Sequence, residues 1–379
     1  MRLLTILPLV ALASARAPLY NLTDVDSLIP DKYIVRFKDT AALSSLDSTL
    51  GNLLGAADYV YAGEFRGFTA TLDQATVELL RDHQDVEYIE QDAIVTATAF
   101  VTQPSAPWNL GRISRRARGA TSYVYDNSAG IGTCVYILDT GIDITHPEFG
   151  GRAILGPNFA NGANTDGNGH GTAVAGVVGS STYGVAKLAT VIGVRVLDAN
   201  GSGTISGIIA GLNWVGQDVR SCPNGRIVNI SLGGGFSAAL NNAVTALVNS
   251  GFLVAVAAGN SASNVANFSP ASAPLACTVG SSDRNDVVAS SSNFGPLLDV
   301  FAPGRDIVTT WPGGGTQTLS GSSMSAPHVA GLGAYLASLE GTTPSGLCAR
   351  IQQLATPNIL TGVPAGTLNL LIFNGNPSG

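Results

Sequence analysis

General-base chemistry has few candidates in this chain of 379 residues, because only four histidines occur in it. His83 lies in the first hundred residues, which leaves His146, His170 and His328 in the remainder. His170 stands in DGNGHGTAVAGVVG, where a glycine-rich loop leads into a predicted helix of small residues. A neutral imidazole at such a rigid and exposed position could accept a proton from a serine hydroxyl.

The segment GSSMSAPHVAG, residues 321–331, could supply that serine. If a helix covers residues 323–340, His328 is turned about 140° away from Ser323 and cannot act on it directly. We therefore predict that His328 is a helix residue hydrogen-bonded to the backbone. A nucleophile at a helix N-terminus gains from the helix dipole and from backbone N–H groups that can face an oxyanion. Ser322 and Ser323 stand where such a helix begins, so one of these two serines is the predicted nucleophile.

A neighbouring carboxylate could fix the tautomer of that imidazole and stabilise its protonated form. Asp139 ends the strand-like run VYILD and offers such a carboxylate. Taken alone, an aspartate after a strand is equally well explained as a turn or capping residue. Only the combination of Asp139 with His170 and the serine block points to nucleophilic catalysis.

Short apolar runs alternate with helix-like stretches beyond residue 100, which is typical of a parallel α/β sheet. The strand-like runs are TCVYILD, TVIGVRVLD, RIVNISLG, FLVAVAAGN, ACTVGSSD and LDVFAPG. Catalytic groups of such sheets gather at the carboxyl ends of strands. We expect Asp139, Asn260 and Asp299 at or near those ends.

Residues 31–92 form a separate predicted unit, with strands KYIVRF, GEFRGFTATL and VEYIEQDAIV and the helix QATVELLRDH. The stretch TATAFVTQPSAPWNL that follows has the character of a linker that a protease could cut, so we place a boundary near residue 100. Residues 1–100 carry 7 Lys and Arg against 14 Asp and Glu, whereas residues 101–379 carry 12 of each. The neutral second unit has no basic patch that would attract nucleic acid or anionic lipid.

The chain begins with MRLLTILPLVALASA, whose early arginine, short apolar run and small-residue ending predict a signal peptide over residues 1–15. No other apolar run approaches the roughly 20 residues of a membrane span, so we expect a soluble, secreted, extracellular protein. Four cysteines in a secreted chain favour two disulfides, with three pairings open. None of them shows the C-x-x-C spacing of a zinc site.

Four segments together resemble the subtilisin-like serine proteases: DTGID at Asp139, HGT at His170, AAGN ending at Asn260, and GSSMSAPHVAG around Ser323. APWNLGRIS and SAGIGTCVYILDTGID resemble the start of the mature enzyme in the secreted fungal proteinase K group. The likeness covers nearly all of the chain after residue 100, and residues 31–92 resemble the inhibitory propeptide of such enzymes.

The resemblance implies an α/β fold, namely a subtilisin-like three-layer domain with a mostly parallel central sheet, preceded by a small α+β ferredoxin-like propeptide domain. The implied domains are a signal peptide at 1–15, a propeptide at 16–100 and a catalytic domain at 101–379. The propeptide acts as inhibitor and folding aid until it is cut near Phe100–Val101. We expect the enzyme to act as a monomer.

The resemblance also assigns roles. Asp139 orients His170, His170 is the general base and Ser323, rather than Ser322, is the nucleophile, in the Asp, His, Ser order of subtilisins. The side-chain amide of Asn260 and the backbone N–H of Ser323 hold the oxyanion. Because His170 must be neutral, activity should rise through neutral pH and persist into the alkaline range.

By the same resemblance, two chain edges pair with an extended peptide, and broad specificity with an apolar or aromatic residue before the cut is implied. One edge is Gly201, Ser202 and Gly203, the other is Ser231, Leu232, Gly233 and Gly234, and the pocket walls are Ala257, Ala258 and Gly259. The implied calcium ligands are the carbonyls of Pro274 and Ala276 and the carboxylate of Asp299. The implied disulfides are Cys134–Cys222 and Cys277–Cys348.

A second, weaker calcium site of some relatives is not expected here. It uses a threonine near the mature start, where Arg116 stands, and an acid near the C-terminus, whereas no Asp or Glu follows Glu340. Sequons occur at Asn21, Asn229 and Asn267. Asn229 lies in a predicted strand, so Asn267 is the better candidate for glycosylation.

Two other functions compete with that of a secreted, calcium-stabilised serine endopeptidase. A catalytically inactive relative that only holds peptides would lack a triad or oxyanion residue, and none is missing. An α/β-hydrolase esterase would carry G-x-S-x-G and the order Ser, Asp, His, and the chain has neither.

Overall fold

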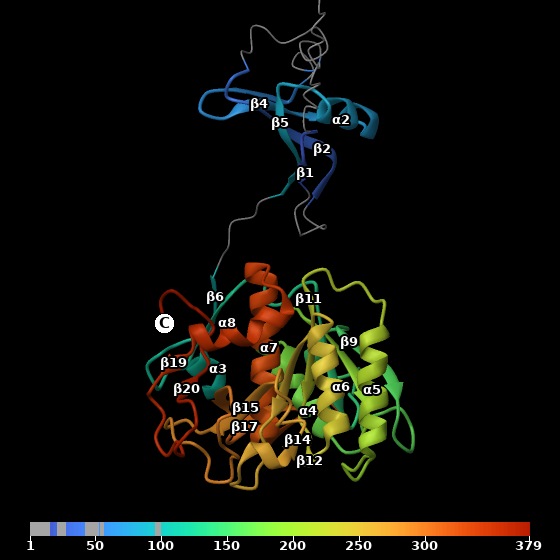
Figure 1. Cartoon of the computed structure of the whole chain (residues 1–379). Coiled ribbons are helices and arrows are strands. Elements are labelled where there is room, and N and C mark those ends of the chain that lie inside the picture. Colours follow the sequence, from blue (N-terminus) through green and yellow to red (C-terminus); the bar gives the residue numbers. More distant parts are fainter. Residues whose placement is uncertain (1–15, 21–27, 42–52, 54–56, 95–99) are drawn as a thin grey trace, which may run out of the picture. The chain divides into compact units, whose positions relative to one another are not determined.

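The chain divides into two compact units, residues Met1–Ala97 and Thr98–Gly379 (Figure 1). The computed structural model describes residues 16–20, 28–41, 53, 57–94 and 100–379. The expected signal peptide at 1–15 and the sequon at Asn21 lie outside the described residues. No helix among the described residues is long and apolar enough to cross a membrane.

The described part of the first unit is a five-stranded sheet with one α-helix packed on it. The order is β1-β5-β2-β4-β3; β1 runs parallel to β5 and the other neighbours are antiparallel. Alternate residues of the strands face α2 in a small core that includes Val35, Phe68 and Ile89. The expected α+β unit is confirmed. Its elements are β1 (Leu19–Tyr20), β2 (Leu28–Phe37), β3 (Tyr59–Ala62), β4 (Arg66–Thr71), α2 (Gln74–Arg81) and β5 (Val86–Ala93).

A nine-stranded sheet in the order β19-β20-β16-β15-β13-β11-β8-β10-β9 forms the centre of the second unit. All neighbours are parallel except β19 and β20. The strands are β8 (Thr133–Asp139), β9 (Ala153–Asn158), β10 (Thr190–Arg195), β11 (Gly225–Ile230), β13 (Leu253–Ala257), β15 (Cys277–Ser282), β16 (Val300–Pro303), β19 (Thr356–Pro357) and β20 (Leu370–Leu371).

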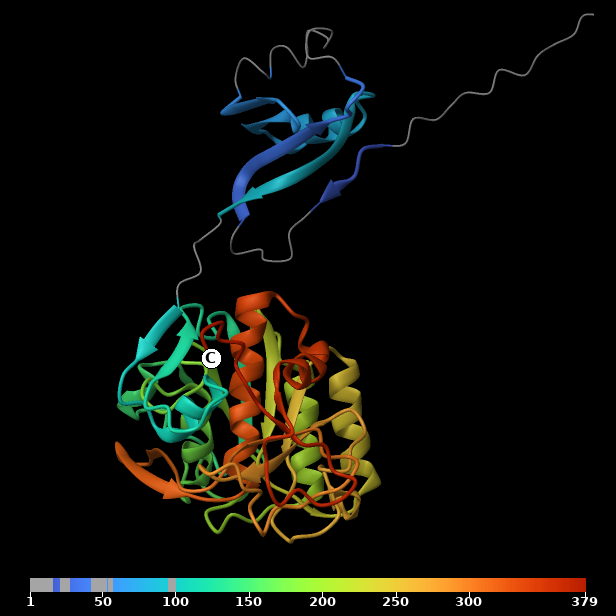
Figure 2. The same ribbon diagram turned by 90° about the vertical axis from the view of Figure 1, so that its left-hand side faces the viewer.

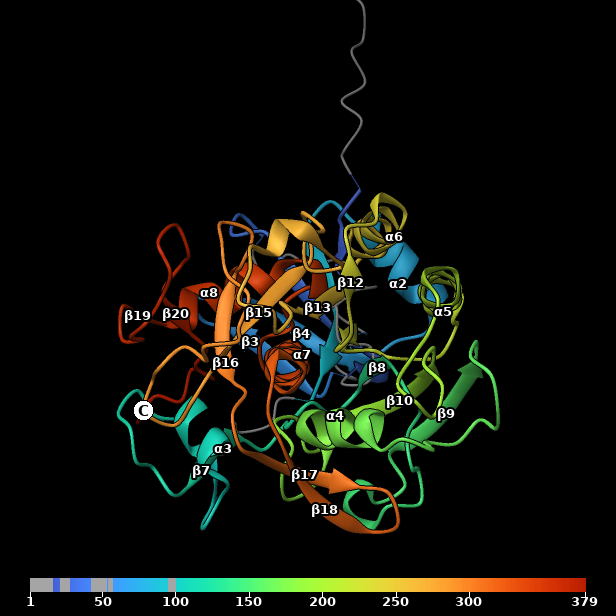
Figure 3. The ribbon, with the colours of Figure 1, turned by 90° about the horizontal axis from the view of Figure 1, so that it is seen from below.

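Helices cover both faces of this sheet, so the strands are buried on both sides and read as continuous apolar runs. Helices α4 (His170–Gly179) and α7 (Ser322–Glu340) share one core with the sheet, and α5 (Ile205–Gln217) and α6 (Ala238–Asn249) share the other. Figures 2 and 3 show α7 on one side of the strands and the α5–α6 pair on the other. The predicted three-layer α/β architecture with a mostly parallel sheet is confirmed.

Three two-stranded ribbons and a few short helices complete the second unit among the described residues. The ribbons are β6 (Phe100–Gln103) with β7 (Tyr123–Asp126), β12 (Gly234–Gly235) with β14 (Phe268–Ser269), and β17 (Ile307–Trp311) with β18 (Gly315–Leu319). The helices are α3 (Trp108–Ile113), α8 (Leu347–Leu354), η2 (Pro147–Phe149), η3 (Val265–Asn267) and η4 (Pro344–Gly346). The disulfides join Cys134 to Cys222 and Cys277 to Cys348, the pairing that the resemblance implies.

The carboxyl ends of the strands hold two of the three polar residues expected there. Asp139 is the last residue of β8, and Asn260 follows the end of β13 at Ala257. The placement of Asp299 at a carboxyl end is wrong, because Asp299 immediately precedes β16 and its backbone N–H bonds to the carbonyl of Thr278 near the start of β15. Asp299 therefore lies at the amino ends of these two strands, away from the edge that carries Asp139.

Candidate active site

Asp139 and His170 make the central contact of the site. The Nδ1–H of His170 donates to Asp139 Oδ1 at 2.8 Å, and the backbone N–H of Thr140 donates to the same oxygen at 2.8 Å. The Asp139 side chain is fully buried, whereas 29 % of the His170 side chain is exposed. The charge of Asp139 raises the pKa of His170, although burial of the ring acts against it. This bond leaves Nε2 of His170 free to accept a proton.

Asp166 ties the loop after Asp139 to the start of α4. Its Oδ1 accepts hydrogen bonds from the Gly169 N–H at 2.7 Å and the Thr140 hydroxyl at 2.8 Å. Its Oδ2 accepts from the backbone N–H and the hydroxyl of Thr172, at 2.8 and 2.6 Å. The role of Asp166 cannot be predicted from the sequence, because Asp166 lies outside the capping position, which Gly169 occupies.

Glycine is required where α4 meets the end of β8. A Cβ added at Gly171 would lie 2.1 Å from the carbonyl oxygen of Gly141 and 3.2 Å from the Cβ of Asp139. A Cβ added at Gly169 would lie 2.4 Å from the ring of Trp311, and the φ of Gly169 is 105°. The glycines around His170 therefore allow the backbone of α4 to approach Asp139 closely enough for the hydrogen bond.

Ser323 is the one serine in its block whose hydroxyl makes no hydrogen bond among the described residues, and Ser322 beside it is fully buried. Both lie in the first turn of α7. The other three serines are each engaged with backbone: Ser320 accepts from Asp306 N–H at 2.9 Å, Ser322 accepts from Gly259 N–H at 3.0 Å, and Ser325 donates to the Ala302 carbonyl at 3.1 Å. The geometry thus separates Ser323 from the alternative that sequence reasoning alone left open.

Asn260 lies beside the start of α7. Its Oδ1 accepts a hydrogen bond from the Ser322 backbone N–H at 2.8 Å, which orients the amide and leaves Nδ2 as a free donor. A Cβ added at Gly321 would be 3.2 Å from this Nδ2, and the φ of Gly321 is 141°, so a glycine is needed here as well. Asn260 is an exposed residue, so Nδ2 can meet a bound molecule.

A pocket of about 260 Å³ opens next to Asn260 and Ser323. The small residues Ala257, Ala258 and Gly259 form one wall, as expected, and Phe268 is also part of the lining. The main chain of residues 232–235 forms another wall.

The two expected peptide-binding edges face each other across a second pocket of about 300 Å³. Gly201, Ser202 and Gly203 line it from one edge, and Leu232, Gly233 and Gly234 from the other. Ile205, Ile208 and Leu240 add apolar side chains to its lining. Ser231 is buried, and its hydroxyl donates to the carbonyl of Ser323 at 2.9 Å, so its side chain supports the site rather than the peptide.

The other two histidines of this unit have structural partners. His328 is fully buried, and Nδ1–H donates to the carbonyl of Met324 at 2.7 Å, as predicted. Burial lowers the pKa of His328 to about 4, so the ring is neutral. His146 is also buried and bonds through Nε2 to the carbonyl of Gly315 at 2.9 Å.

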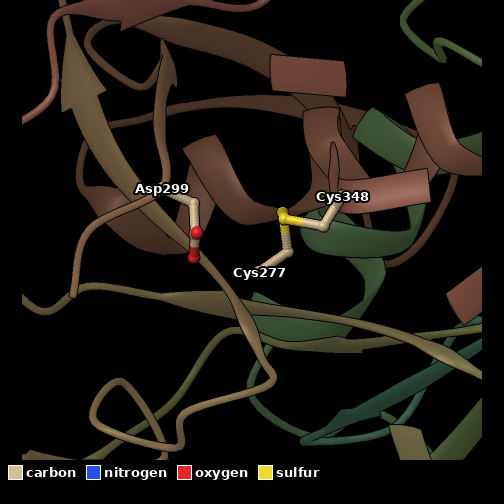
Figure 4. Close-up of side chains that lie close together, drawn as sticks. All are labelled: Cys277, Asp299 and Cys348. Carbon is tan, nitrogen blue, oxygen red and sulfur yellow. A yellow bond between two sulfur atoms is a disulfide. The ribbon is translucent and has the colours of Figure 1, made fainter. Parts of the chain in front are cut away.

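Asp299 lies next to the disulfide Cys277–Cys348, as Figure 4 shows. The two sulfur atoms are bonded to each other, so this cluster is not a thiolate metal site. The carboxylate accepts hydrogen bonds from the Thr278 N–H at 2.8 Å and the Gln352 amide at 3.1 Å. Burial raises the pKa of Asp299 to about 6.

A buried carboxylate bonded to an imidazole, with a serine hydroxyl and an amide donor at the N-terminus of a neighbouring helix, is the set of groups that serine hydrolases use. The parallel sheet with helices on both faces places the protein among the α/β enzymes. Residues 130–363 match the family model described as the subtilase family, and residues 32–98 match peptidase inhibitor I9. The chain belongs to the subtilase family and is a serine protease with an inhibitor-type N-terminal unit.

Two fungal relatives match nearly the whole chain. A subtilisin-like serine protease, AsES, of Sarocladium strictum is 56 % identical, covering 96 % of this chain and 94 % of its own length. A cuticle-degrading protease of Metarhizium anisopliae is 52 % identical, covering 98 % of both chains. The crystal structure of a cold adapted subtilisin-like serine proteinase is 43 % identical with a TM-score of 0.68, covering 71 % of this chain and 98 % of its own.

We predict that Gly171→Ala lowers kcat by about 10- to 100-fold, because the added methyl group pushes α4 away from Gly141 and lengthens the bond between His170 and Asp139. The matched control is Gly216→Ala in α5, where the new Cβ would meet only Leu247 at 3.4 Å. Peptide hydrolysis at pH 8 measures both variants. Equal kcat values for the two alanine variants would contradict the packing argument.

Proposed function

We propose that the protein is a secreted endopeptidase that cuts peptide bonds through the triad Asp139, His170 and Ser323. The observation that carries this proposal is the 2.8 Å bond between the buried Asp139 and the partly exposed His170. Ser323 Oγ attacks the carbonyl carbon of the scissile bond, and its proton passes to His170 Nε2. The tetrahedral oxyanion is held by the Asn260 side-chain amide and the Ser323 backbone N–H.

Collapse of that intermediate breaks the C–N bond, and the proton on Nε2 passes to the leaving amine. Water then attacks the ester on Ser323 while His170 Nε2 accepts a proton from it. Collapse of the second tetrahedral intermediate breaks the bond from the carbonyl carbon to Ser323 Oγ, Nε2 returns the proton to Oγ, and the second peptide leaves with a new carboxyl group. Asp139 stays ionised throughout, holding the Nδ1–H tautomer and stabilising the imidazolium.

We infer broad specificity with an apolar or aromatic residue before the cut. Two observations support this: the pocket beside Ser323 has small walls, and the two glycine-rich edges offer main-chain rather than side-chain recognition. Pairing of the peptide backbone with these edges tolerates many sequences, and the pocket selects by size and apolarity.

We further propose that the protein is made as a precursor, with residues 1–15 removed as a signal peptide and residues 16–100 acting as inhibitor. The match of residues 32–98 to peptidase inhibitor I9 supports the second part. The proposed cut between Phe100 and Val101 falls within β6, where both side chains are partly exposed, at 43 and 38 %.

The direct test is reaction of the secreted protein with a fluorophosphonate, followed by mass spectrometry of the adduct and of the mature N-terminus. We expect one adduct, on Ser323, in a chain that begins near residue 101, and none in Ser323→Ala. Ser322→Ala is the informative control, because it should keep the adduct. Labelling at Ser322, or a folded chain that takes no label, would overturn the assignment.

The pH dependence tests His170. Since Asp139 raises the pKa of His170, kcat/KM should fall as the pH drops through that raised pKa and stay high into the alkaline range. Asp139→Asn removes the charge, so the acid limb should move to lower pH, and the plateau kcat should fall about 10⁴-fold because the correct tautomer is lost. An acid limb that does not move in this variant would show that another group controls activity.

We also propose a structural Ca²⁺ held by the Asp299 carboxylate with the carbonyls of Pro274 and Ala276. Hard oxygen ligands of this kind suit calcium. The Asp299 carboxylate suits such a site, since burial raises its pKa to about 6 and it pairs with no Lys or Arg among the described residues. A bound cation would supply the missing positive charge and cross-link the starts of β15 and β16, without part in the reaction.

Asp299→Asn in the inactive Ser323→Ala background tests this site. We expect calcium to raise the Tm of the parent and to leave the Tm of the variant unchanged. Without calcium, the variant should have a higher Tm than the parent, because the substitution removes a buried charge. Asp218→Asn is the control, since this carboxylate is 10 % exposed and pairs with Arg220 at 3.7 Å. Scanning calorimetry with calcium or EGTA gives the answer; a calcium response kept by Asp299→Asn would exclude the site.

Asn267 is the sequon we propose to be glycosylated. It is exposed at the end of η3, whereas Asn229 is fully buried within β11. A glycan there would stand next to Phe268, part of the lining of the pocket beside Ser323.

A further inference from the structure

The loop that carries Asn260 has no regular secondary structure over residues 258–263. Gly259 and Ala262 adopt positive φ angles of 99° and 48°, so the loop departs from the extended path of β13 on both sides of Asn260. The amide of Asn260 is exposed, and among the described residues its side chain makes one hydrogen bond, which Oδ1 accepts from Ser322. An oxyanion donor must nevertheless be held within about 0.5 Å of its working position. The structure must therefore fix this loop by other means.

Asn293 fills that role, because its side chain bonds to the loop on both sides of Asn260. Its Nδ2 donates to the carbonyl of Ala258 at 2.8 Å. Its Oδ1 accepts from the backbone N–H groups of Ser261 at 2.9 Å and Ser263 at 3.1 Å. The residue is fully buried, so these bonds form without competition from solvent. One carboxamide thus holds three backbone groups of an irregular loop.

Backbone contacts bring Asn293 to this position and no other. The N–H of Asn293 donates to the carbonyl of Gly259 at 3.0 Å, and the N–H of Phe294 donates to the carbonyl of Ser263 at 3.0 Å. A Cβ at Gly259 would lie 2.5 Å from Asn293 Nδ2, so only glycine leaves room for the amide. The positive φ and the missing side chain of Gly259 are both needed for the contact.

We propose that Asn293 is a positioning residue for the oxyanion site: it sets the place of Asn260 and thereby the rate of the chemical step. The proposal rests on the role proposed above for Asn260. Asn293 is not itself part of the lining of the pocket beside Ser323, and it holds the lining residues Ala258 and Ser261 by their backbone groups, so it acts through the loop. Serine, aspartate and alanine cannot replace it, because none of them combines one donor with an acceptor of the same reach.

The first arm compares Asn293→Ala with the parent on a peptide amide substrate. We expect kcat to fall about 10- to 100-fold while KM changes less than about threefold, because displacement of a transition-state donor costs rate rather than ground-state binding. A peptide aldehyde, whose adduct carries an oxyanion, should bind more weakly by the same factor as kcat/KM, whereas a product peptide should bind unchanged. Complete fluorophosphonate labelling counts the folded sites in each preparation.

Asn374→Ala is the matched control. Asn374 is also fully buried, and its amide bonds to the carbonyl of Val124 at 2.8 Å and to the N–H of Asn376 at 3.1 Å, with no contact to the loop. It should lose stability as Asn293→Ala does and keep its kcat per labelled site. Equal kcat values in the two variants would overturn the proposal.

The second arm is the double variant with Asn260→Ala. Asn260→Ala alone should lower kcat about 10²- to 10³-fold, as removal of an oxyanion-hole donor does in a subtilisin, and adding Asn293→Ala should lower kcat by less than about threefold more. Losses of kcat that multiply in the double variant would show that Asn293 acts elsewhere, and would overturn the proposal.

The single variants distinguish this inference from the proposed role of Asn260. A normal kcat in Asn260→Ala would overturn both the oxyanion assignment and this inference. A low kcat in Asn260→Ala together with a normal kcat in Asn293→Ala would overturn this inference alone. If Asn293→Ala does not fold, Asn293→Ser takes its place in both arms with the same expected pattern.

Discussion

The hydrogen bond between Asp139 and His170 is the constraint on which the rest of the structure depends. A carboxylate that is fully buried must be paired, and here its partner sits at the first residue of a helix from another segment of the chain. The parallel sheet brings β8 to the right place, and the glycines of α4 remove the side chains that would hold the two backbones apart. The buried acid, the small-residue helix and the glycine-rich loop are therefore all needed to form this one hydrogen bond.

Ser323 belongs to the same helix layer as His170. Helices α4 and α7 pack on one face of the sheet, so the N-termini of both helices bring His170 and Ser323 to the side of the molecule where β8 and β13 end. Each reactive group stands on irregular backbone or in a first helical turn, where N–H groups are unpaired and can be directed at a substrate. Regular elements supply the frame, and the reactive groups occupy their ends.

The sequence pattern alone predicted a parallel α/β sheet beyond residue 100, because apolar runs alternate with helix-like stretches there, and the family resemblance added the three layers. Without the family resemblance, sequence patterns cannot distinguish Ser322 from Ser323 as the nucleophile, since both lie in the first turn of a helix. The structure gives a physical reason to prefer Ser323, because Ser322 is buried and its hydroxyl is bonded to Gly259. The sequence pattern predicts the wrong end of the strand for Asp299, because nothing in the run LDVFAPG indicates at which residue the β-sheet hydrogen bonding begins. The β16 ladder starts at Val300.

Asp166 and Asn293 were missed for one common reason. Each uses a single polar side chain to hold backbone groups that come from distant segments or irregular loops: Asp166 joins Thr140 to the first turn of α4, and Asn293 holds the loop around Asn260. No local pattern marks such a residue, because its partners are defined by tertiary structure rather than by spacing. A chain that places its reactive groups at the ends of elements gains exposed donors there but loses the ladder of hydrogen bonds that fixes regular backbone, and buried carboxylate and carboxamide groups restore that rigidity.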